Sequence, residues 1–520
     1  MIVLVGFMGA GKSTVGPLVA RRLGLPFVDV DRVVEERAGA PVAELFATRG
    51  EDAFRALESA AAADALDRDD GVVALGGGAL GDDATRAQLR DHTVVYLRAP
   101  YEELVARIGN PSSRPLLARG DARALWAARG PVYERVADIV VDTAARDAHD
   151  VAREVAARAE VAAVRRVVVG LRERAYEVAV GHGIAARVAR WLPDERGDAA
   201  FVVTHPELAR HAAAVRSSLE AAGMRVHALE VPAGEGSKSL ATAQALYSEL
   251  ARRAAHRDDV VVSVGGGVVC DVAGFVASTY NRGMQIVHVP TTLLAQVDAA
   301  IGGKTGVNLP HGKNLVGTFH QPHAVVCDVA TLTTLPDAEL RSGLAEVVKY
   351  GLIADPSLLE RVVSGADALL ARDAAVLGDV VAASAAIKAG VVAADEREAG
   401  VRAHLNYGHT FAHALETLRG HGELRHGEAV AVGMMAAAHL ARVLERIDDA
   451  DVDVHRRALE SVGLPVSASL ELRDLESAWV RDKKFRGTVR FVLLAGVGKP
   501  EAGIAAPRDA LERALERLAR

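Results

Sequence analysis

The sequence is poor in cysteine and lacks any excess of positive charge. Its 520 residues include only Cys270 and Cys327, too few for a disulfide framework or a zinc knuckle, and they suit a reducing compartment. The formal net charge of −7 argues against nucleic acid as a main partner. The apolar run Ile2–Val5 has no basic segment before it and is interrupted at Gly6, so we expect no signal peptide and no membrane span. A cytoplasmic protein is therefore predicted.

Lysine is also scarce, because only nine of the 61 basic residues are lysines. Arginine stands wherever a plain positive charge is enough, so the lysines are candidates for sites that need a compact ammonium group. The alternative is that each is an ordinary surface lysine. All except Lys499 fall in or beside the motifs described below: Lys12, Lys238, Lys304, Lys313, Lys349, Lys388, Lys483 and Lys484.

The length predicts about two to four domains. Short apolar runs at Ile2–Val5, Val72–Leu75 and Val94–Leu97 alternate with helical patterns, which predicts a doubly wound parallel α/β domain. From Arg146 to Arg165 the chain is rich in alanine and charge, without glycine or proline, and reads as a terminal helix running into a linker. We place the end of the first domain at residue 160.

A second α/β pattern follows. Its expected strands are Val167–Val169, Tyr176–Val180, Ala200–Thr204, Val226–Val231, Val260–Val264, Ile286–Val289 and Ala324–Asp328. After about Leu335 helical patterns dominate, apart from an expected hairpin around Val489–Leu494. We therefore expect an α/β dinucleotide-binding domain over 161–335 and a mainly helical, metal-binding domain over 336–520.

The segment GFMGAGKST, Gly6–Thr14, fits the phosphate-binding loop pattern G-x-x-x-x-G-K-[ST] between a strand and a helix. Its backbone N–H groups can cradle phosphates, while Lys12 reaches the β- and γ-phosphates and Ser13 binds Mg²⁺. The predicted ATP-binding residues are Gly9, Gly11, Lys12, Ser13 and Thr14.

Candidate acceptor residues lie further along this domain. VDVD places Asp29 and Asp31 at the end of a second strand, where Asp29 could lie in the outer shell of Mg²⁺ and Asp31 could face an acceptor hydroxyl; both could equally be helix caps. Other candidates are Arg55 in FRALE, the glycines Gly76–Gly78, Arg114 in a Pro/Ser-rich segment suited to a lid, and Arg129 before GPVYERVA.

With these residues in place, the segment resembles shikimate kinase over nearly its whole length. The resemblance implies that Asp31, Arg55, Gly77, Gly78 and Arg129 hold shikimate. It also implies that Lys12 and Arg114 stabilise the transferring phosphoryl group, and that Arg107 packs on adenine. A trihydroxy acid needs an arginine fork for its carboxylate and an acid for its hydroxyls, which these residue types supply.

In the second part, DDVVVSVGGGVVCDVAGF places Gly265–Gly267 between a strand and a helix. This is a weak dinucleotide signal without GxGxxG spacing. Asp271, and Glu235 with Lys238 in GEGSKS, strengthen it. The glycine-rich segment from Val289 to Gly317 is suited to an anion-binding wall because it gathers Thr291, Thr292, Asp298, Lys304, Lys313 and Asn314.

Histidines crowd the segment NYGHTFAHALETLRGHGELRHGE. His409 and His413 lie one helical turn apart, a natural pair of metal ligands by spacing. Glu346, in the apolar LAEVVKYG beside Lys349, either pairs with a base or binds a metal. His426 stands at the start of an apolar helix. Spacing alone leaves the ligand set open.

These motifs resemble 3-dehydroquinate synthase from about Val167 onward. The resemblance implies Zn²⁺ (or Co²⁺) bound by Glu346, His409 and His426 with an open position for substrate oxygens. His413 then lies beside the metal without binding it, and His421 matches no family position and is interpreted as a loop histidine. The implied NAD⁺-binding residues are Glu235, Lys238, Gly265, Gly266, Gly267, Asp271, Thr291, Thr292, Lys313 and Thr334.

The same resemblance implies the substrate site. Its residues are Asp298, Lys304, Asn314, Lys349, Lys388, Arg402, Asn406, and Lys483 or Lys484; the catalytic residues are Asp298, Lys304, Lys349 and His413, as Lys12, Asp31 and Arg114 are in the kinase. Arg282 matches an arginine that reaches into the neighbouring subunit's site, which implies a homodimer. His205 departs from the family, because an Asn or Asp is expected there near the cofactor ribose.

The implied reactions are ATP- and Mg²⁺-dependent phosphorylation of shikimate, and an internal redox cycle. That cycle oxidises C5 of 3-deoxy-D-arabino-heptulosonate 7-phosphate with NAD⁺, eliminates phosphate, returns the hydride and closes the ring to 3-dehydroquinate. Three alternatives stay open at this point. The second part could be a metal-dependent polyol dehydrogenase of related fold, or a cyclase acting on another sugar phosphate. The first domain could be a nucleotide-binding regulator, although Asp31, Arg55 and Arg129 together count against it.

Overall fold

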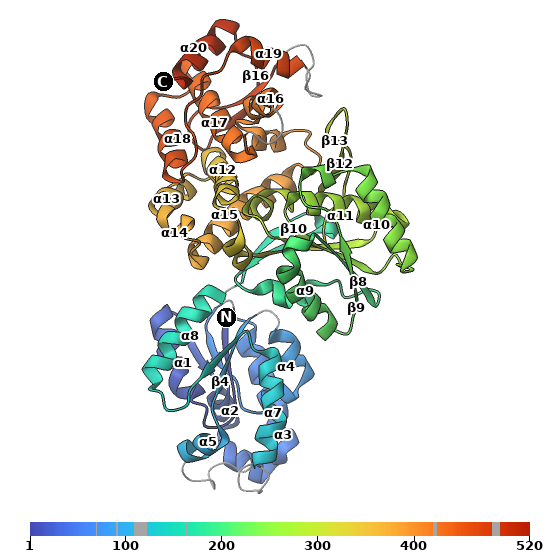
Figure 1. Ribbon diagram of the computed structural model, residues 1–520. Helices are drawn as coiled ribbons and strands as arrows, with labels where there is room; N and C mark the ends of the chain where they lie inside the picture. The colour runs from blue at the N-terminus through green and yellow to red at the C-terminus, as the bar shows by residue number, and fades with distance from the viewer. Residues whose placement is uncertain (69, 90–91, 109–121, 163, 420–423, 481–488) are drawn as a thin grey trace. The chain divides into compact units, whose positions relative to one another are not determined.

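The computed structural model describes residues 1–68, 70–89, 92–108, 122–162, 164–419, 424–480 and 489–520 (Figure 1). Contacts within the chain divide it into two compact units, Met1–Val164 and Arg165–Arg520. Each has its own apolar core. We call them the first and the second unit.

The first unit is a parallel five-stranded sheet in the order β2-β3-β1-β4-β5, covered by helices, which confirms the predicted fold class. Its strands are β1 (Ile2–Val5), β2 (Phe27–Asp29), β3 (Val72–Ala74), β4 (Thr93–Arg98) and β5 (Ile139–Asp142). Its helices are α1 (Lys12–Leu23), α2 (Val30–Ala38), α3 (Val42–Leu66), α4 (Asp83–Gln88), α5 (Tyr101–Ile108), α7 (Ala122–Val136) and α8 (Ala148–Ala162). The strands are almost wholly apolar because both faces of a parallel sheet are buried.

The strand order gathers three loops at one edge of this sheet. β3 lies between β1 and β2, and all three strands run in the same direction. Their carboxyl ends therefore meet at one edge, where α/β sheets bind ligands. The segments that leave this edge are the phosphate-loop motif after β1, the aspartates after β2 and the glycine triplet after β3.

The second unit begins with a seven-stranded sheet in the order β6-β7-β14-β11-β10-β8-β9, in which only β6 runs antiparallel to its neighbour. The strands are β6 (Arg165–Val169), β7 (Tyr176–Gly181), β8 (Ala199–Thr204), β9 (Arg225–Glu230), β10 (Val260–Gly265), β11 (Gln285–Pro290) and β14 (Ala324–Asp328), each within a residue or two of its expected position. Their helices are α9 (Ala209–Ala221), α10 (Leu240–Arg252) and α11 (Gly267–Thr279). β9 and β10 lie on opposite sides of β8, so the strand order reverses between β8 and β10. A crevice for a dinucleotide is expected at that reversal.

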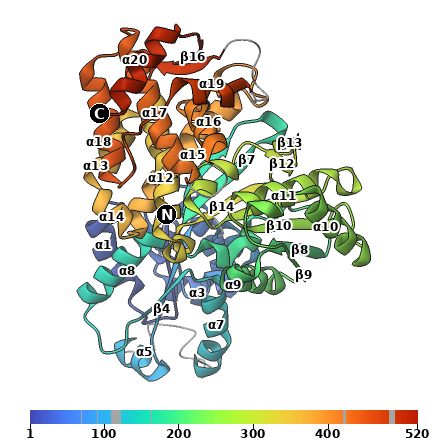
Figure 2. The ribbon, with the colours of Figure 1, turned by 45° about the horizontal axis from the view of Figure 1, so that its top comes forward.

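Helices form most of the rest of the second unit (Figures 1 and 2), as the sequence predicted. They are α12 (Asp337–Ile353), α13 (Pro356–Ser364), α14 (Ala366–Leu370), α15 (Ala374–Ala394), α16 (His409–Arg419), α17 (His426–Val443), α18 (Asp449–Ser461), α19 (Leu472–Val480) and α20 (Arg508–Leu518). The expected C-terminal hairpin is present as β15 (Phe491–Leu494) and β16 (Pro500–Ile504). A second hairpin, β12 (Lys304–Leu309) with β13 (Gly312–Phe319), was not predicted.

One helix, α15, is long and apolar enough to cross a membrane by length and composition. Half of that stretch is buried inside the unit, and it carries Lys388, whose side chain is buried as well. α15 packs on α12 and on β6 of the sheet. It is therefore a core helix of the second unit.

Two glycines of α17 allow three helices to approach closely. A Cβ built on Gly427 would lie 2.3 Å from the carbonyl oxygen of Ser342 on α12, and one on Gly433 would lie 2.2 Å from that of Gly408 at the start of α16. Real Cβ atoms essentially never come this close to backbone oxygens. Only glycine therefore permits α17 to touch the backbones of both α12 and the turn before α16.

We predict that Gly433→Ala destabilises the second unit by about 1–3 kcal/mol, because the added methyl group forces α16 and α17 apart. Calorimetry of the full chain, following the transition of the second unit, measures this. Gly390→Ala is the matched control, since Gly390 is exposed on α15 and its Cβ would meet nothing within 4 Å. That change should stabilise by about 0.5–1 kcal/mol. Equal stability of Gly433→Ala and the wild type would show that the close approach is not required.

Candidate active sites

The loop after β1 has the backbone of a phosphate cradle. Gly9 and Gly11 adopt φ angles of 81° and 93°, a left-handed conformation that favours glycine. α1 starts at Lys12, followed by Ser13 and Thr14, and has no acidic residue in its first turn. The Lys12 ammonium group donates to the carbonyl oxygens of Gly6 at 2.7 Å and Phe7 at 3.3 Å. A positive helix terminus and an ammonium group thus face the same loop, which suits a nucleotide phosphate chain.

The two aspartates after β2 differ in their surroundings. Asp29 caps α2, accepting a hydrogen bond from the backbone N–H of Asp31 at 3.1 Å. The interpretation as a helix cap therefore applies to Asp29. Asp31 lies in the first turn of α2 and lines a pocket of about 420 Å³ of empty space, part of it open to solvent. The other predicted shikimate residues line it too: Arg55, Gly77, Gly78 and Arg129.

A buried acid that sequence reasoning missed, Glu58, also lines this pocket. Its carboxylate accepts from Arg55 Nη1 at 2.5 Å, and the residue is 2 % exposed. Burial raises the pKa of Glu58, while Arg55 opposes the rise. The spacing of Arg55 and Glu58, three residues apart on α3, is the signal that could have identified the pair.

The glycine triplet makes room for this ion pair. A Cβ on Gly76 would lie 2.1 Å from Glu58 Oε1, and a Cβ on Gly78 would lie 2.0 Å from Arg55 Nη1. The carbonyl oxygen of Gly77 accepts from Arg129 Nη1 at 2.7 Å and from the Tyr133 hydroxyl at 2.6 Å, which fastens α7 to the loop.

The remaining predicted kinase residues lie elsewhere. Arg107 on α5 donates through Nη1 to the Thr143 hydroxyl at 3.0 Å and through Nη2 to its carbonyl oxygen at 2.5 Å. It therefore fixes the loop after β5. Arg114 lies outside the described residues.

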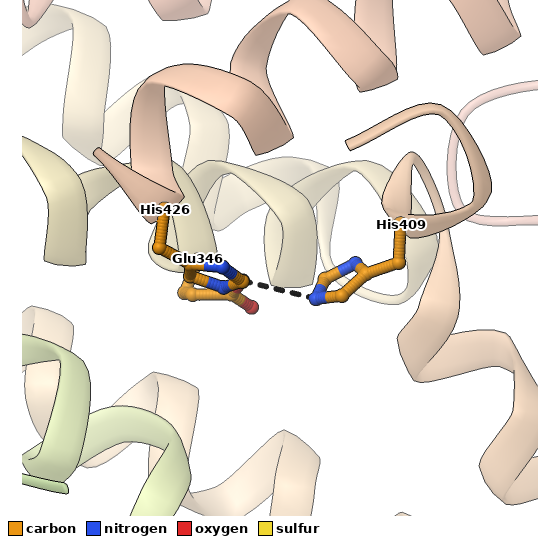
Figure 3. A group of neighbouring side chains, drawn as sticks. All are labelled: Glu346, His409 and His426. Atoms are coloured by element: carbon orange, nitrogen blue, oxygen red, sulfur yellow. Dashed lines mark ion pairs between the residues drawn. The ribbon is translucent and has the colours of Figure 1, made fainter. Parts of the chain in front are cut away.

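In the second unit, three helices bring Glu346, His409 and His426 together (Figure 3). Glu346 lies within α12, whereas His409 and His426 are the first residues of α16 and α17. The Nε2 atoms of the two histidines lie 3.5 and 3.4 Å from the same carboxylate oxygen, Glu346 Oε1. One potential ligand atom from each of the three lies within 4.8 Å of the others.

These residues fit a divalent cation. Glu346 is fully buried, and neither of its oxygens accepts a hydrogen bond from any residue that the structure describes, although Lys349 forms an ion pair with it. One ion pair satisfies this buried carboxylate only in part, and a divalent cation bound to it would complete its compensation. Two imidazoles and one carboxylate are the ligand types of catalytic zinc sites. His413 lies beside the group, with its ring centre 5.5 Å from that of His409. His421 lies outside the described residues.

The Nδ1 atoms of His409 and His426, the ring nitrogens that do not face Glu346, have different partners. His409 Nδ1 lies 3.1 Å from the carbonyl oxygen of Tyr407, and His426 Nδ1 lies 3.1 Å from Glu416 Oε1. The Tyr407 hydroxyl contacts His455 Nε2 at 2.7 Å, and His455 Nδ1 contacts the carbonyl oxygen of Asp451 at 2.7 Å. α18 therefore supports the backbone that holds His409. Sequence reasoning missed Glu416 and His455.

An ion pair between buried Lys388 and half-buried Asp298 lies close to Glu346. The Lys388 ammonium group on α15 contacts Asp298 Oδ1 at 2.6 Å and donates to the Asp298 carbonyl oxygen at 2.5 Å. The Tyr350 hydroxyl donates to Asp298 Oδ1 at 2.9 Å. Burial works against ionisation of Asp298, but Lys388 and Lys349 hold its pKa well below the usual range.

Further predicted substrate residues meet at one acid. Glu398, which the sequence reasoning did not identify, accepts from Lys304 Nζ at 2.6 Å and from Asn406 Nδ2 at 3.0 Å. Its φ angle of 61° marks it as unusual for a residue other than glycine. Arg402 is almost fully buried and donates to the carbonyl oxygen of Gly302 at 3.0 Å. Lys483 and Lys484 lie outside the described residues.

The predicted nucleotide residues border the reversal of strand order. Gly265 ends β10 and Gly267 starts α11, so the glycine triplet leaves the carboxyl end of β10. A Cβ on Gly265 would lie 2.5 Å from Val269, so this turn requires glycine. The other predicted contacts follow neighbouring elements: Thr291 and Thr292 after β11, the ion pair Lys238–Asp271 beside α11, and Glu235, which accepts from Asn308 at 2.7 Å.

Four predicted residues stand further from these clusters. His205 follows β8 directly, and its buried Nδ1 has no hydrogen-bond partner among the residues described. The Thr334 hydroxyl contacts His211 Nε2 at 3.0 Å. Arg282, after α11, and Asn314, on β13, have φ angles of 65° and 54°. The Asn314 backbone N–H donates to Asn308 Oδ1 at 2.8 Å, which ties it to the strand that contacts Glu235.

Comparisons with known proteins match both units. Residues 228–342 and 343–485 match the sequence profiles of the N-terminal and C-terminal parts of 3-dehydroquinate synthase, and residues 8–160 match shikimate kinase. The 3-dehydroquinate synthase of Mycobacterium leprae is 47% identical over 327 residues, which is 62% of this chain and 90% of the relative.

Two solved structures resemble the second unit. The first is 2-deoxy-scyllo-inosose synthase with carbaglucose-6-phosphate, NAD⁺ and Co²⁺, at 27% identity and a TM-score of 0.62 over 69% of this chain and 100% of that one. The second is 2-epi-5-epi-valiolone synthase from Streptomyces hygroscopicus with NAD⁺ and Zn²⁺, at 27% identity and a TM-score of 0.59 over 66% and 96%.

We predict that His455 makes the second unit less stable in acid. Burial lowers its pKa from 6.5 to about 4, so between these values the unfolded state binds the proton that the folded state rejects. Stability is therefore present above about pH 6.5 and is lost as the pH falls towards 4. Between pH 7 and 4.5, the wild type should lose on the order of 2–3 kcal/mol more than His455→Gln in denaturant unfolding. Parallel pH profiles would contradict this.

Proposed function

Because residues 8–160 belong to the shikimate kinase family and the second unit belongs to the 3-dehydroquinate synthase family, we propose that each unit holds a complete active site. The chain is a bifunctional shikimate-pathway enzyme. It phosphorylates shikimate with ATP and Mg²⁺, and it converts 3-deoxy-D-arabino-heptulosonate 7-phosphate to 3-dehydroquinate and phosphate with NAD⁺ and Zn²⁺ or Co²⁺. The observation that carries the synthase assignment is the convergence of Glu346, His409 and His426 beside buried ammonium groups.

In the kinase, the pocket residues bind and orient the acceptor. Arg55 and Arg129 bind the shikimate carboxylate, and Glu58 fixes the Arg55 guanidinium group so that little side-chain freedom is lost on binding. Asp31 accepts a hydrogen bond from the hydroxyl that attacks the γ-phosphate and takes up its proton. Lys12 leaves its carbonyl partners for the phosphates, and Arg114 joins it in stabilising the transferring group. Ser13 and Asp29 would hold Mg²⁺, which would neutralise charge on the phosphates.

In the synthase, the side chains hold a doubly anionic substrate against the metal and the cofactor. When bound, Zn²⁺ polarises the substrate oxygen at C5 and NAD⁺ accepts and returns a hydride. Glu346, His409 and His426 hold the cation. Lys304, Asn314, Lys388, Arg402 and Asn406, with Lys483 or Lys484, bind the carboxylate and phosphate. Asp298, Lys349 and His413 position the substrate hydroxyls and move protons.

We further propose three domains, 1–160, 161–335 and 336–520, and a cytoplasmic homodimer joined through the synthase part. The dimer is supported by Arg282, which has no carboxylate partner among the described residues and matches an arginine that acts in the neighbouring subunit.

We expect the two activities to be separable by single substitutions. Lys12→Met should lower shikimate-dependent ADP formation at least 100-fold and leave phosphate release from the heptulosonate phosphate unchanged. Glu346→Gln should do the reverse, because it removes a metal ligand from the other unit. Coupled assays of ADP, phosphate and 3-dehydroquinate on the full chain measure both. Nicotinamide absorbance should stay constant during synthase turnover; NADH accumulating with product would instead identify a polyol dehydrogenase.

The dimer proposal is tested by complementation. Arg282→Ala and Lys304→Ala should each abolish synthase activity when expressed alone. Co-expressed with different tags and purified as mixed dimers, the two chains form one intact site from Lys304 of one and Arg282 of the other. Because one of the two sites in each purified mixed dimer is intact, these dimers should recover about half of wild-type activity. No recovery would show that Arg282 acts in its own subunit.

A further inference from the structure

The carboxylate of Glu416 lies beside Nδ1 of His426, the ring nitrogen that does not face Glu346. We propose that Glu416 is a positioning residue of the metal site, which orients His426 and strengthens its binding of a divalent cation. This inference rests on the proposed assignment of Glu346, His409 and His426 as ligands. None of the roles described above assigns a function to Glu416.

The His426 ring is held by carboxylates on two different helices. Its Nε2 faces Glu346 of α12 at 3.4 Å, and its Nδ1 faces Glu416 of α16 at 3.1 Å. A neutral imidazole carries one N–H group, and a carboxylate can only accept. If Nδ1–H donates to Glu416, the lone pair of Nε2 is left for the cation. Glu416 therefore selects the tautomer that can bind metal and prevents the ring from rotating.

His409 lacks an equivalent charged partner among the described residues. Its Nδ1 faces the carbonyl oxygen of Tyr407, a neutral acceptor. A carboxylate withdraws the Nδ1 proton more strongly than a carbonyl group does, which makes the opposite nitrogen a better donor to a metal. The two histidines are thus unequal ligands, and His426 is the stronger one.

Charge supports the same assignment. The Lys349 ammonium group pairs with Glu346, so the formal charges of the ligand carboxylate and its neighbour cancel. Glu416, with a side chain only 18 % exposed, supplies negative charge on the opposite side of His426. Lys313 also acts on Glu416 electrostatically.

The sequence and the helix packing both fix this geometry. His409, His413 and Glu416 occupy positions i, i+4 and i+7 of α16, so one helix face carries a ligand, its neighbour and the partner of the other ligand. The close contact of Gly433 with Gly408 sets the position of α16 relative to α17. The packing of α16 against α17 therefore brings Glu416 to His426.

The test measures metal binding directly. The full-length apoprotein and its Glu416→Gln variant are titrated with Co²⁺ in competition with a chromophoric chelator, and visible spectra of the Co²⁺ forms are recorded. We expect Glu416→Gln to bind Co²⁺ about 10–100-fold more weakly and to show a shifted spectrum. Glu339→Gln is the matched control, because Glu339 contacts Arg425, the residue just before His426, but no imidazole. It should bind Co²⁺ as the wild type does.

The outcomes separate this inference from the metal site itself. Wild-type affinity and spectrum in Glu416→Gln would overturn the inference, and so would a loss as complete as that of Glu346→Gln, because Glu416 would then be a ligand. Undiminished Co²⁺ binding by Glu346→Gln would instead overturn the ligand assignment. If the Glu416→Gln apoprotein has a lower melting temperature than the wild type, Glu416→Asp serves as the second variant. It keeps the negative charge but has a shorter side chain. It should bind at least threefold more weakly than the wild type, and equal binding would again overturn the inference.

Discussion

The second unit depends on a buried carboxylate that its protein surroundings satisfy only in part. Glu346 is fully buried on α12, with an ion pair to Lys349 and no hydrogen bond from the described residues. Two imidazoles converge on one of its oxygens from helices that start at the ligands themselves. Such an arrangement is stable when a divalent cation completes it. The packing of α12, α16 and α17 and the chemistry of the site therefore both require the same bound cation.

In both units, glycine is required at certain positions because it lacks a side chain, and not because its backbone is flexible. In the first unit, Gly76 and Gly78 leave space for the Arg55–Glu58 pair, and in the second, Gly427 and Gly433 let helix backbones touch. In the first unit, the missing methyl groups leave space for the charged Arg55 and Glu58 side chains. In the second unit, they allow the backbone of α17 to lie against those of α12 and the turn before α16. The two sites bind unrelated groups, yet both rely on backbone brought unusually close to its neighbours.

The sequence predicted those features that are carried by local pattern. The phosphate loop, the seven-stranded sheet, the helical C-terminal part and the hairpin at β15 all follow from strand and helix periodicity. The β12–β13 hairpin was missed because its glycines and polar residues hide the alternation of a strand. Spacing favoured His413 as the partner of His409, whereas the structure brings His426 to Glu346. The spacing of residues within one helix does not show which other helices pack beside it. Tyr350, Glu398 and Glu416 were missed for the same reason, because each contacts a residue that only folding brings close, whereas the i,i+3 spacing of Arg55 and Glu58 was a local signal that was overlooked. Of the predicted site residues, Arg114, Lys483 and Lys484 lie outside the described part of the chain.

The pair formed by Asp298 and Lys388 has a wider meaning for the synthase. Asp298 follows β11 of the sheet and Lys388 belongs to α15, so their contact joins the sheet to the helical part of the second unit. An ion pair of this kind contributes only while both partners are present, so the segment after β11 and α15 depend on each other within the second unit. The kinase, by contrast, has its own core and its own pocket, so a gene fusion or fission between the two units would leave both chemistries whole.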